Sequence, residues 1–257
     1  MNRAILRDLK VWESLSIKSS SKGNQKKYYS SSEDAYIKLR FFYQNKYWCD
    51  ELVELLASDL FKNLGVVEQV PVWTPDGWGC YSKNFAKSKS FVTYNTILET
   101  SSFVKVPKDN SENFEFIKKV IREETSLDAT DYLLTIALTD AVVLNEDRHW
   151  NNFGVMYDGK FYIAPIFDYG LGLFECDEMY QYHKNITTAR RDVKAKPFLT
   201  NHFKTLTSLV NAGYLCELQH LFYKIDWDLP NLYAPNVLAI SHICKVKSDL
   251  EELLCLK

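Results

Sequence analysis

LNEDRHWNNFGVMYDGKFYIAPIFDYG, residues 144–170, places a dense polar cluster between apolar segments. The segment before the cluster, 129–144, is mostly apolar with helical periodicity, which predicts a buried helix. Two strand-like runs follow at 153–157 and 160–167, and the Asp158-Gly159 pair between them is a strong hairpin signal. Burying so many polar groups is costly unless each one has a partner. A cluster of this kind is therefore more typical of a functional site than of a loop.

The segments on the N-terminal side predict a β-rich region with one helix. Residues 35–44 are rich in β-branched and aromatic side chains, which predicts a strand. Leucines recur at three- and four-residue spacing over 48–64, which predicts an amphipathic helix that Gly65 ends. Residues 66–85 are expected to form a β-hairpin around the Pro-Asp-Gly turn at 75–77.

The order of elements indicates two unequal lobes. After residue 86 we expect mainly helices, and besides the buried helix the helical regions are 113–124, 198–223 and 236–256. The chain thus has a β-rich front, residues 1–86, and a helix-rich back, residues 87–257, which holds one hairpin. We expect an α+β fold with a small N-terminal lobe and a larger C-terminal lobe.

The composition is that of an ordinary globular protein. The 257 residues include 31 Lys and Arg against 33 Asp and Glu, and the net charge of −2 argues against direct nucleic-acid binding. None of the six cysteines forms a C-x-x-C pair, so we expect reduced thiols and no zinc site. The sequence has no apolar run of signal-peptide or membrane-spanning character. We therefore expect a cytoplasmic protein that does not bind membranes, with signal-independent export left open.

Phosphoryl transfer from ATP suits the residue types of the polar cluster. The reaction needs positioning and charge neutralisation more than covalent chemistry. A carboxylate must orient the attacking hydroxyl, and an amide with a second carboxylate must hold Mg²⁺, which prefers oxygen ligands. Asp147 and Asn152 have the spacing of the kinase D-x-x-x-x-N catalytic loop. Asp168 precedes x-Gly, as the metal-holding Asp does in the kinase D-F-G element.

Two further positions complete the same order. Lys38 lies mid-strand in AYIK, as a lysine does in the kinase V-A-I-K strand. The following helix carries Glu51 and Glu54, and either could pair with Lys38. Each signal alone arises often by chance, but their joint occurrence in kinase order predicts a phosphotransferase that uses ATP and Mg²⁺.

The cluster also resembles a known family. The pattern N-x-D-x-H-x-x-N, followed by an aromatic residue, a hairpin, A-P and a D-x-x turn, is similar to that of the HipA-type serine/threonine kinases. The compact length and the F-D-x-G form resemble the shorter, CtkA-like branch, and the KPF segment 196–198 is also similar. The resemblance is specific over 144–172 and loose over about 16–205, and it implies a two-lobed protein-kinase-like fold. The matching residues are Asn145, Asp147, His149, Asn152, Phe153, Ala164, Pro165 and Asp168.

Carried over position by position, the resemblance implies roles for the site residues. Asp147 would be the catalytic carboxylate that contacts the substrate hydroxyl. Asn152 and Asp168 would bind Mg²⁺. Lys38 would contact the ATP phosphates, and Glu54 would orient Lys38.

The resemblance also implies a hinge and a phosphate loop. The hinge would be CYSKNF, residues 80–85, where Ser82 and Asn84 would offer backbone groups to adenine. The family's phosphate loop resembles SSSKGNQKK, residues 19–27. Because Gly23 is the only glycine in this loop, serine and lysine side chains must replace part of the backbone cradle.

In this family a loop serine can be autophosphorylated, which ejects the loop and shuts the site. Ser20 lies three residues before Gly23, at the matching position, and Ser19 and Ser21 are equally available. We therefore expect self-inactivation by phosphorylation within this loop.

The leading hypothesis is an ATP- and Mg²⁺-dependent serine/threonine protein kinase that acts on a protein substrate. One alternative is a small-molecule phosphotransferase of the aminoglycoside or choline kinase type, which shares the catalytic and metal-binding residues. Another is a nucleotide-binding pseudokinase, against which the intact set of those residues argues. A third is the toxin half of a toxin–antitoxin pair, whose partner would be a DNA-binding antitoxin.

Overall fold

The protein is a mixed α+β structure, as expected. The computed structural model describes residues 5–6, 13–15, 27–43, 46–48, 50–103, 110–173, 193–228 and 237–256. These residues form seven α-helices, one short 3₁₀ helix and four β-sheets. Residues 19–26 of the predicted phosphate loop, with Gly23 and the candidate phosphorylation sites Ser19, Ser20 and Ser21, lie outside the described residues, and the last residue of the loop, Lys27, begins β3. The division into lobes at residue 86 stays a prediction.

The largest sheet has six strands in the order β1-β7-β8-β4-β3-β2. β1 is parallel to β7, and the other neighbours are antiparallel. The predicted lysine strand and hinge strand, β4 and β8, lie side by side at its centre, and β7 and β8 form the predicted hairpin. The strands are β1 (Ile5–Leu6), β2 (Glu13–Leu15), β3 (Lys27–Ser30), β4 (Ala35–Leu39), β7 (Val70–Thr74) and β8 (Gly77–Lys83).

Three smaller sheets complete the β structure of the described residues. One has the order β11-β10-β9, and the other two pair β5 with β6 and β12 with β13. β10 and β11 are the hairpin that the Asp158-Gly159 pair predicts. The strands are β5 (Phe41–Tyr43), β6 (Lys46–Trp48), β9 (Ser90–Thr93), β10 (Gly154–Tyr157), β11 (Phe161–Ile163), β12 (Lys194–Ala195) and β13 (Thr200–Asn201).

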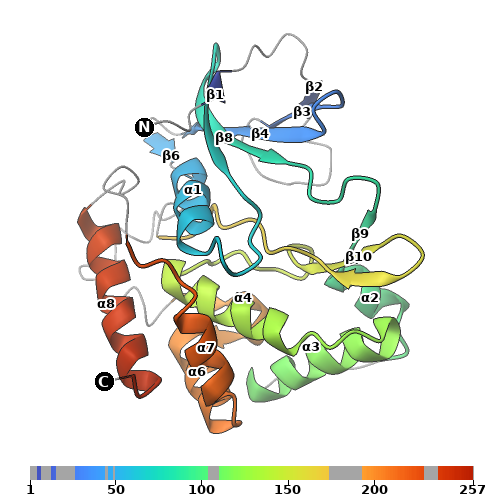
Figure 1. The fold of residues 1–257 in the computed structure, drawn as a ribbon, viewed down its shortest axis with the longest axis vertical. Helices are drawn as coiled ribbons and strands as arrows, with labels where there is room; N and C mark the ends of the chain where they lie inside the picture. The colour runs from blue at the N-terminus through green and yellow to red at the C-terminus, as the bar shows by residue number, and fades with distance from the viewer. Residues whose placement is uncertain are drawn as a thin grey trace.

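The helices pack around the predicted buried helix, α4. Its residues from Tyr132 to Val143 are all buried, and it contacts α6, α7 and α8. Figure 1 shows the six-stranded sheet and α1 at one end of the molecule and the other long helices at the opposite end. The helices are α1 (Asp50–Leu60), α2 (Tyr94–Thr100), α3 (Asn110–Thr125), α4 (Thr130–Val143), α6 (His202–Asn211), α7 (Leu215–Phe222) and α8 (Val237–Leu253).

Several element boundaries differ from the prediction. The predicted strand over 35–44 divides into β4 and β5, which pair with different partners. The predicted helix over 48–64 ends at Leu60, because the chain turns before Gly65, whose φ is +71°. The helix expected over 198–223 is two helices, because Gly213 has a φ of +101° between them. The prediction of mainly helices and one hairpin after residue 86 does not include β9, a short strand that pairs with β10 and runs directly into α2.

The alternating burial of β4 positions the predicted lysine. Ala35, Ile37 and Leu39 are buried and pack in a small core with other residues of the sheet. Lys38 therefore lies on the opposite face of the strand, since successive side chains alternate. Among the described residues, no helix combines the length and the apolar character that crossing a membrane requires.

Candidate functional site

Lys38 joins two acidic side chains from distant parts of the chain. Its Nζ lies 2.5 Å from Oε1 of Glu54 on α1 and 3.1 Å from Oδ1 of Asp168. Glu51, the other acidic candidate, instead accepts a hydrogen bond of 2.5 Å from Nε of Arg40. The structure therefore selects Glu54 from the two acids that the sequence offered.

The charges of this group support one another. Removal from water alone would raise the pKa of Asp168, but the Lys38 and Lys27 ammonium groups outweigh it and hold that pKa far below its ordinary value. Burial alone would lower the pKa of Lys38, but the carboxylates of Asp168 and Glu54 keep that pKa well above its ordinary value. Lys38 and Asp168 are therefore both charged at neutral pH.

Lys27 is a second lysine on the same face of the sheet. It is the direct cross-strand partner of Lys38, so the two side chains lie beside each other. Burial and the charge of Lys38 lower the pKa of Lys27. Two adjacent lysines repel each other unless anionic groups lie near them, and this position is suited to an anionic ligand.

The loop after α4 is fixed by its own side chains. Asn145 donates through Nδ2 to Oδ1 of Asp140 at 3.1 Å and to the carbonyl of Asp168 at 3.2 Å. Its Oδ1 accepts the backbone N–H of Asp147 at 3.1 Å. Nδ2 of Asn152 donates to the carbonyl of Asp147 at 3.0 Å. These bonds fix the backbone on both sides of Asp147.

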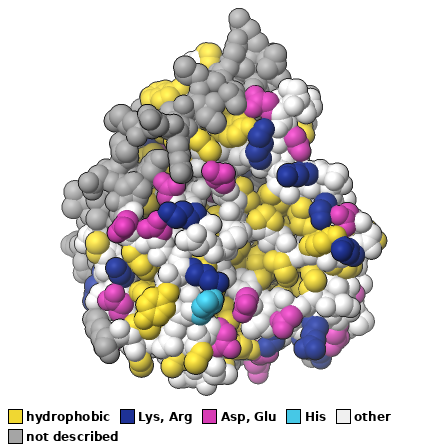
Figure 2. Space-filling view, viewed as in Figure 1, with side chains coloured by type: hydrophobic (Ala, Val, Ile, Leu, Met, Phe, Trp, Pro, Cys, Tyr) yellow, Lys and Arg dark blue, Asp and Glu magenta, His cyan; other side chains and the backbone are white. Residues whose placement is uncertain are grey.

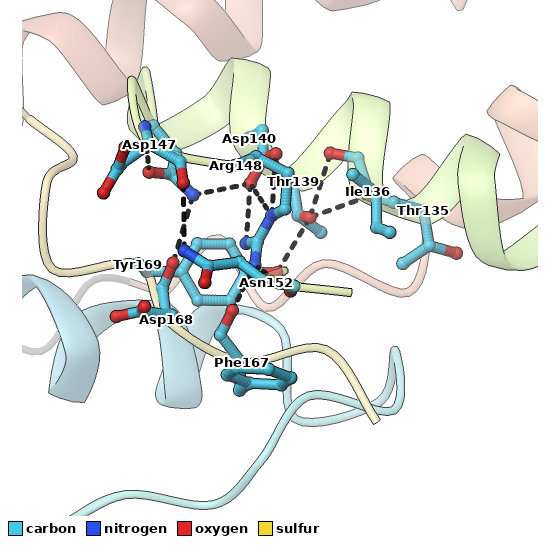
Figure 3. A network of polar contacts seen from close by, with 11 residues as sticks. Thr135, Ile136, Thr139, Asp140, Asp147, Arg148, Asn152, Phe167, Asp168 and Tyr169 are labelled. Carbon is cyan, nitrogen blue, oxygen red and sulfur yellow. Dashed lines mark hydrogen bonds and ion pairs between the residues drawn. The ribbon is translucent and has the colours of Figure 1, made fainter. Parts of the chain in front are cut away.

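Arg148 is the buried centre of this loop. Its guanidinium pairs with Asp140 at 2.9 Å and donates to the carbonyls of Asn152, at 3.1 Å, and Phe167. It also lies over the ring of Tyr169, 4.8 Å from the centroid. Figure 3 shows Arg148 between the Asp140 carboxylate and the segment that carries Phe167 and Asp168. One side chain thus fixes α4, the loop and the Asp168 segment relative to one another.

Asp168 has an unusual backbone conformation. Its φ is +66°, in the left-handed region that aspartate tolerates better than most residues. The next residue, Tyr169, is buried, and its hydroxyl lies 2.9 Å from Oγ1 of Thr139 on α4. The buried tyrosine anchors the segment, while the Asp168 carboxylate stays partly exposed beside Lys38.

The donor set fits a magnesium ion that is shared with phosphate. Because Nδ2 of Asn152 is bound to a carbonyl, its amide oxygen is the end left to act as a ligand. Asp168 supplies a carboxylate that is ionised at neutral pH. In the described part of the chain, no group of three or more His, Cys, Asp or Glu could hold a metal by itself. A hard cation would therefore need phosphate and water oxygens as its remaining ligands.

The strand register changes the expected hinge contacts. Asn84 donates its backbone N–H to the carbonyl of Asp34 at 2.8 Å, and Ser82 is the partner of Tyr36 on β4. Because hydrogen bonding alternates along an antiparallel pair, Ser82 and Asn84 both direct their backbone groups toward the β4 side. The backbone groups of Lys83, which lies between these two residues, are directed to the opposite edge of β8, away from β4. In this register the backbone groups of Lys83 are the ones directed away from β4, and the adenine contacts expected of Ser82 and Asn84 stay a prediction.

An aromatic cluster lies next to the hinge. Phe85, Phe91 and Phe167 are partly exposed, and their ring centroids are 5.0, 5.3 and 5.5 Å apart. Phe167 directly precedes Asp168, so the cluster adjoins the charged group. Figure 2 shows hydrophobic side chains gathered on this face at the height of the β9–β10–β11 sheet. The surface thus offers an apolar area beside lysines and carboxylates.

The sequence predictions missed part of this site. Arg148 lies in the polar cluster and Asp140 lies inside the apolar helix, and the sequence alone assigns no role to either residue. A carboxylate inside such a helix is the signal that could identify the Asp140–Arg148 pair, because buried charges are paired. Lys196 was also missed, and its Nζ contacts Oδ1 of Asp147.

The fold of the chain is similar to that of known solved structures. The chain matches no protein-family model and no curated protein. It is similar to the solved structure of the proinflammatory kinase CtkA of Helicobacter pylori, with a TM-score of 0.67, 19% identity and 96% of each chain covered. It is also similar to HipA of the Shewanella oneidensis MR-1 toxin–antitoxin system, solved with HipB and operator DNA, with a TM-score of 0.54 and 13% identity. The second match covers 96% of this chain and 66% of that chain. The chain therefore has the fold of the HipA- and CtkA-like kinases.

Proposed function

We propose that this protein is an ATP- and Mg²⁺-dependent kinase of the HipA/CtkA-like type that phosphorylates serine or threonine hydroxyls of a protein. The observation that carries the proposal is the convergence of Lys38, Glu54 and Asp168, which lie far apart in the sequence. Asp147 and Asn152 lie on the loop that Asn145 bonds to the Asp168 segment. No single structural requirement of the fold explains why these groups meet.

Each group has a place in this reaction. Lys38 and Lys27 would bind the phosphates, and the aromatic cluster with the Lys83 backbone would receive the base. Asp168 and Asn152 would hold Mg²⁺, which would neutralise phosphate charge when bound. Asp147 would orient the acceptor hydroxyl and accept its proton.

The choice of a protein acceptor and of a partner also belongs to the proposal. Support for a protein kinase comes from the match to CtkA over nearly the full length of both chains. Because HipA was solved with HipB and operator DNA, a DNA-binding antitoxin-like partner is proposed for this chain as well. Self-inactivation through Ser19, Ser20 or Ser21 is the proposed regulation of the loop.

The test is transfer of label from [γ-³²P]ATP with Mg²⁺ and a generic protein acceptor. Asp147→Ala is expected to lower transfer by about 10²–10⁴-fold, the contribution of a positioned general base. Asp168→Ala is expected to abolish most transfer, because it removes a proposed ligand of Mg²⁺. Asp158→Ala, which removes an exposed acid of the β10–β11 turn, is the matched control and should retain activity. Undiminished incorporation in Asp147→Ala would exclude the proposed role of that residue.

Further measurements distinguish the alternative functions and test the self-inactivation. Label in a small-molecule alcohol but in no protein would indicate a small-molecule phosphotransferase, and nucleotide binding without transfer would indicate a pseudokinase. Mass spectrometry after incubation with ATP should find phosphate within residues 16–34. An unmodified segment would contradict the self-inactivation.

A further inference from the structure

A lysine outside the predicted site contacts the proposed catalytic carboxylate. Nζ of Lys196 contacts Oδ1 of Asp147, although the two residues are 49 positions apart. Within the described residues, no other side chain bonds to the Asp147 carboxylate. The contact therefore joins the loop after α4 to a separate element of the fold.

The element that carries Lys196 is firmly anchored. Lys196 begins the 3₁₀ helix η3 (Lys196–Phe198), in which Pro197 and Phe198 are buried. The ring of Phe198 lies 6.3 Å from that of Phe114 on α3. On either side of η3, β12 and β13 pair with each other, with Ala195 opposite Thr200. The backbone of Lys196 is thus fixed while its side chain extends toward Asp147.

Stability of the fold does not account for this ion pair. The side chains of Lys196 and Asp147 are 51% and 31% exposed. Ion pairs with this much exposure contribute little to stability, because water and salt screen them and both side chains lose entropy. A fixed backbone that holds a cation over this carboxylate is better explained by a role in the site.

The other cations near the loop are already engaged. Arg148 is buried, and its donors are directed to Asp140 and to backbone carbonyls. Lys38 is bound to Glu54 and Asp168. Lys196 is thus the one cation, among the described residues, that contacts the carboxylate expected to receive the acceptor proton.

We propose that Lys196 is a catalytic residue that contacts the transferred phosphoryl group. This inference rests on the proposed function. In the transfer, the acceptor hydroxyl oxygen forms a bond to the γ-phosphorus of ATP while the bond from that phosphorus to the β–γ bridging oxygen breaks. ADP leaves with the electron pair, and the hydroxyl proton passes to the Asp147 carboxylate. As Asp147 becomes neutral, its attraction for Lys196 is lost, and the ammonium group is free to neutralise the oxygens of the transferring group.

The first test compares steady-state kinetics of Lys196→Met, Lys196→Arg and Lys194→Met. Lys196→Met is expected to lower kcat at least tenfold, with the KM for ATP and the melting temperature close to those of the wild type. Lys196→Arg, which keeps the charge, should retain more activity than Lys196→Met. Lys194→Met is the matched control, since Lys194 is an exposed lysine on the adjoining strand β12, and it should behave as the wild type. If Lys196→Met does not fold, Lys196→Gln is the second neutral variant.

The second test measures binding, so it does not depend on turnover. Mg²⁺·ADP should bind wild type and Lys196→Met equally. Mg²⁺·ADP with aluminium fluoride, a mimic of the transferring phosphoryl group, should bind Lys196→Met at least tenfold more weakly in the presence of acceptor protein. Equal aluminium fluoride affinity, or an unchanged kcat, would overturn the role of Lys196 and leave the proposed kinase intact. A wild type that neither binds nucleotide nor transfers phosphate would overturn both proposals.

Discussion

Two ion-pair groups in the site differ in burial and in how fully their bonding capacity is used. The side chains of Arg148 and Asp140 are 0% and 3% exposed, and all three guanidinium nitrogens donate within the protein. Lys38 and Asp168 are 20% and 36% exposed. The first group holds segments of the chain together, whereas the second can still bind a ligand. The two groups consist of the same kinds of side chain. Their difference in burial therefore distinguishes the structural pair, Arg148 and Asp140, from the pair that is accessible to a ligand, Lys38 and Asp168.

The largest expected loss of stability comes from breaking the buried pair of Arg148 and Asp140. Arg148→Met should lower the free energy of unfolding by about 3–5 kcal/mol, because it leaves the Asp140 charge buried without a cationic partner and with only the Asn145 amide bonded to it. Chemical denaturation measures the change. Arg122→Met, at an exposed arginine on α3, is the control and should have little effect. A loss as small as that of the control would mean that Arg148 does not hold these segments together.

A smaller loss of stability is expected when the pH is lowered, because His202 lies near the Arg148–Asp140 pair. Burial lowers the pKa of His202, the first residue of α6, to about 4, with Asp140 and Arg148 as its charged neighbours. The unfolded chain binds the proton at an ordinary pKa of about 6.5, so it takes up more protons than the folded chain between these values. The contribution of His202 to stability is therefore complete above pH 6.5 and is lost as the pH falls toward 4, by at most about 1.4 kcal/mol per pH unit.

Denaturation curves at several pH values check this prediction. In His202→Gln, the free energy of unfolding should decline less steeply between pH 6.5 and 4 than in the wild type. His220→Gln, at an exposed histidine on α7, should leave the decline as it is in the wild type. Parallel pH profiles for the wild type and His202→Gln would contradict the prediction.

The smallest effect on stability, with a clear effect on activity, is expected at Glu54, the buried member of the group that Lys38 and Asp168 form. Glu54→Gln keeps the shape of the side chain but weakens its bond to Lys38, so transfer should fall by about 10–100-fold, while the free energy of unfolding should change by no more than about 1–1.5 kcal/mol. Glu51→Gln is the matched control, since this neighbour on α1 bonds to Arg40 instead. Equal loss of transfer in both variants would remove the distinction between the two acids.

Local patterns predicted much of this fold. The run of apolar residues before Leu144 is long enough to specify α4, and the Asp158-Gly159 pair is enough to specify the β10–β11 hairpin. The pairing of Lys38 with an acid of α1 could also be predicted, because strand and helix adjoin in the sequence. These features depend on residues close together in the chain.

Features that depend on tertiary packing could not be predicted. The spacing of the residues leaves Glu51 and Glu54 open, because the choice depends on how α1 rotates against the sheet, and only the family resemblance implies Glu54. The direction of the Ser82 backbone depends on the register of β4 with β8, which composition does not reveal. The partner of Asp147 comes from a segment 49 residues away, and although this KPF segment resembles the family, its sequence does not indicate the contact.

The separation of Asp140 and Arg148 has a consequence for finding distant relatives. These residues are eight positions apart, across the end of α4, and their ion pair is buried. Lysine lacks the planar fork that reaches Asp140 and two carbonyls at once. A search pattern that requires this aspartate and this arginine in addition to D-x-x-x-x-N would discard most chance matches.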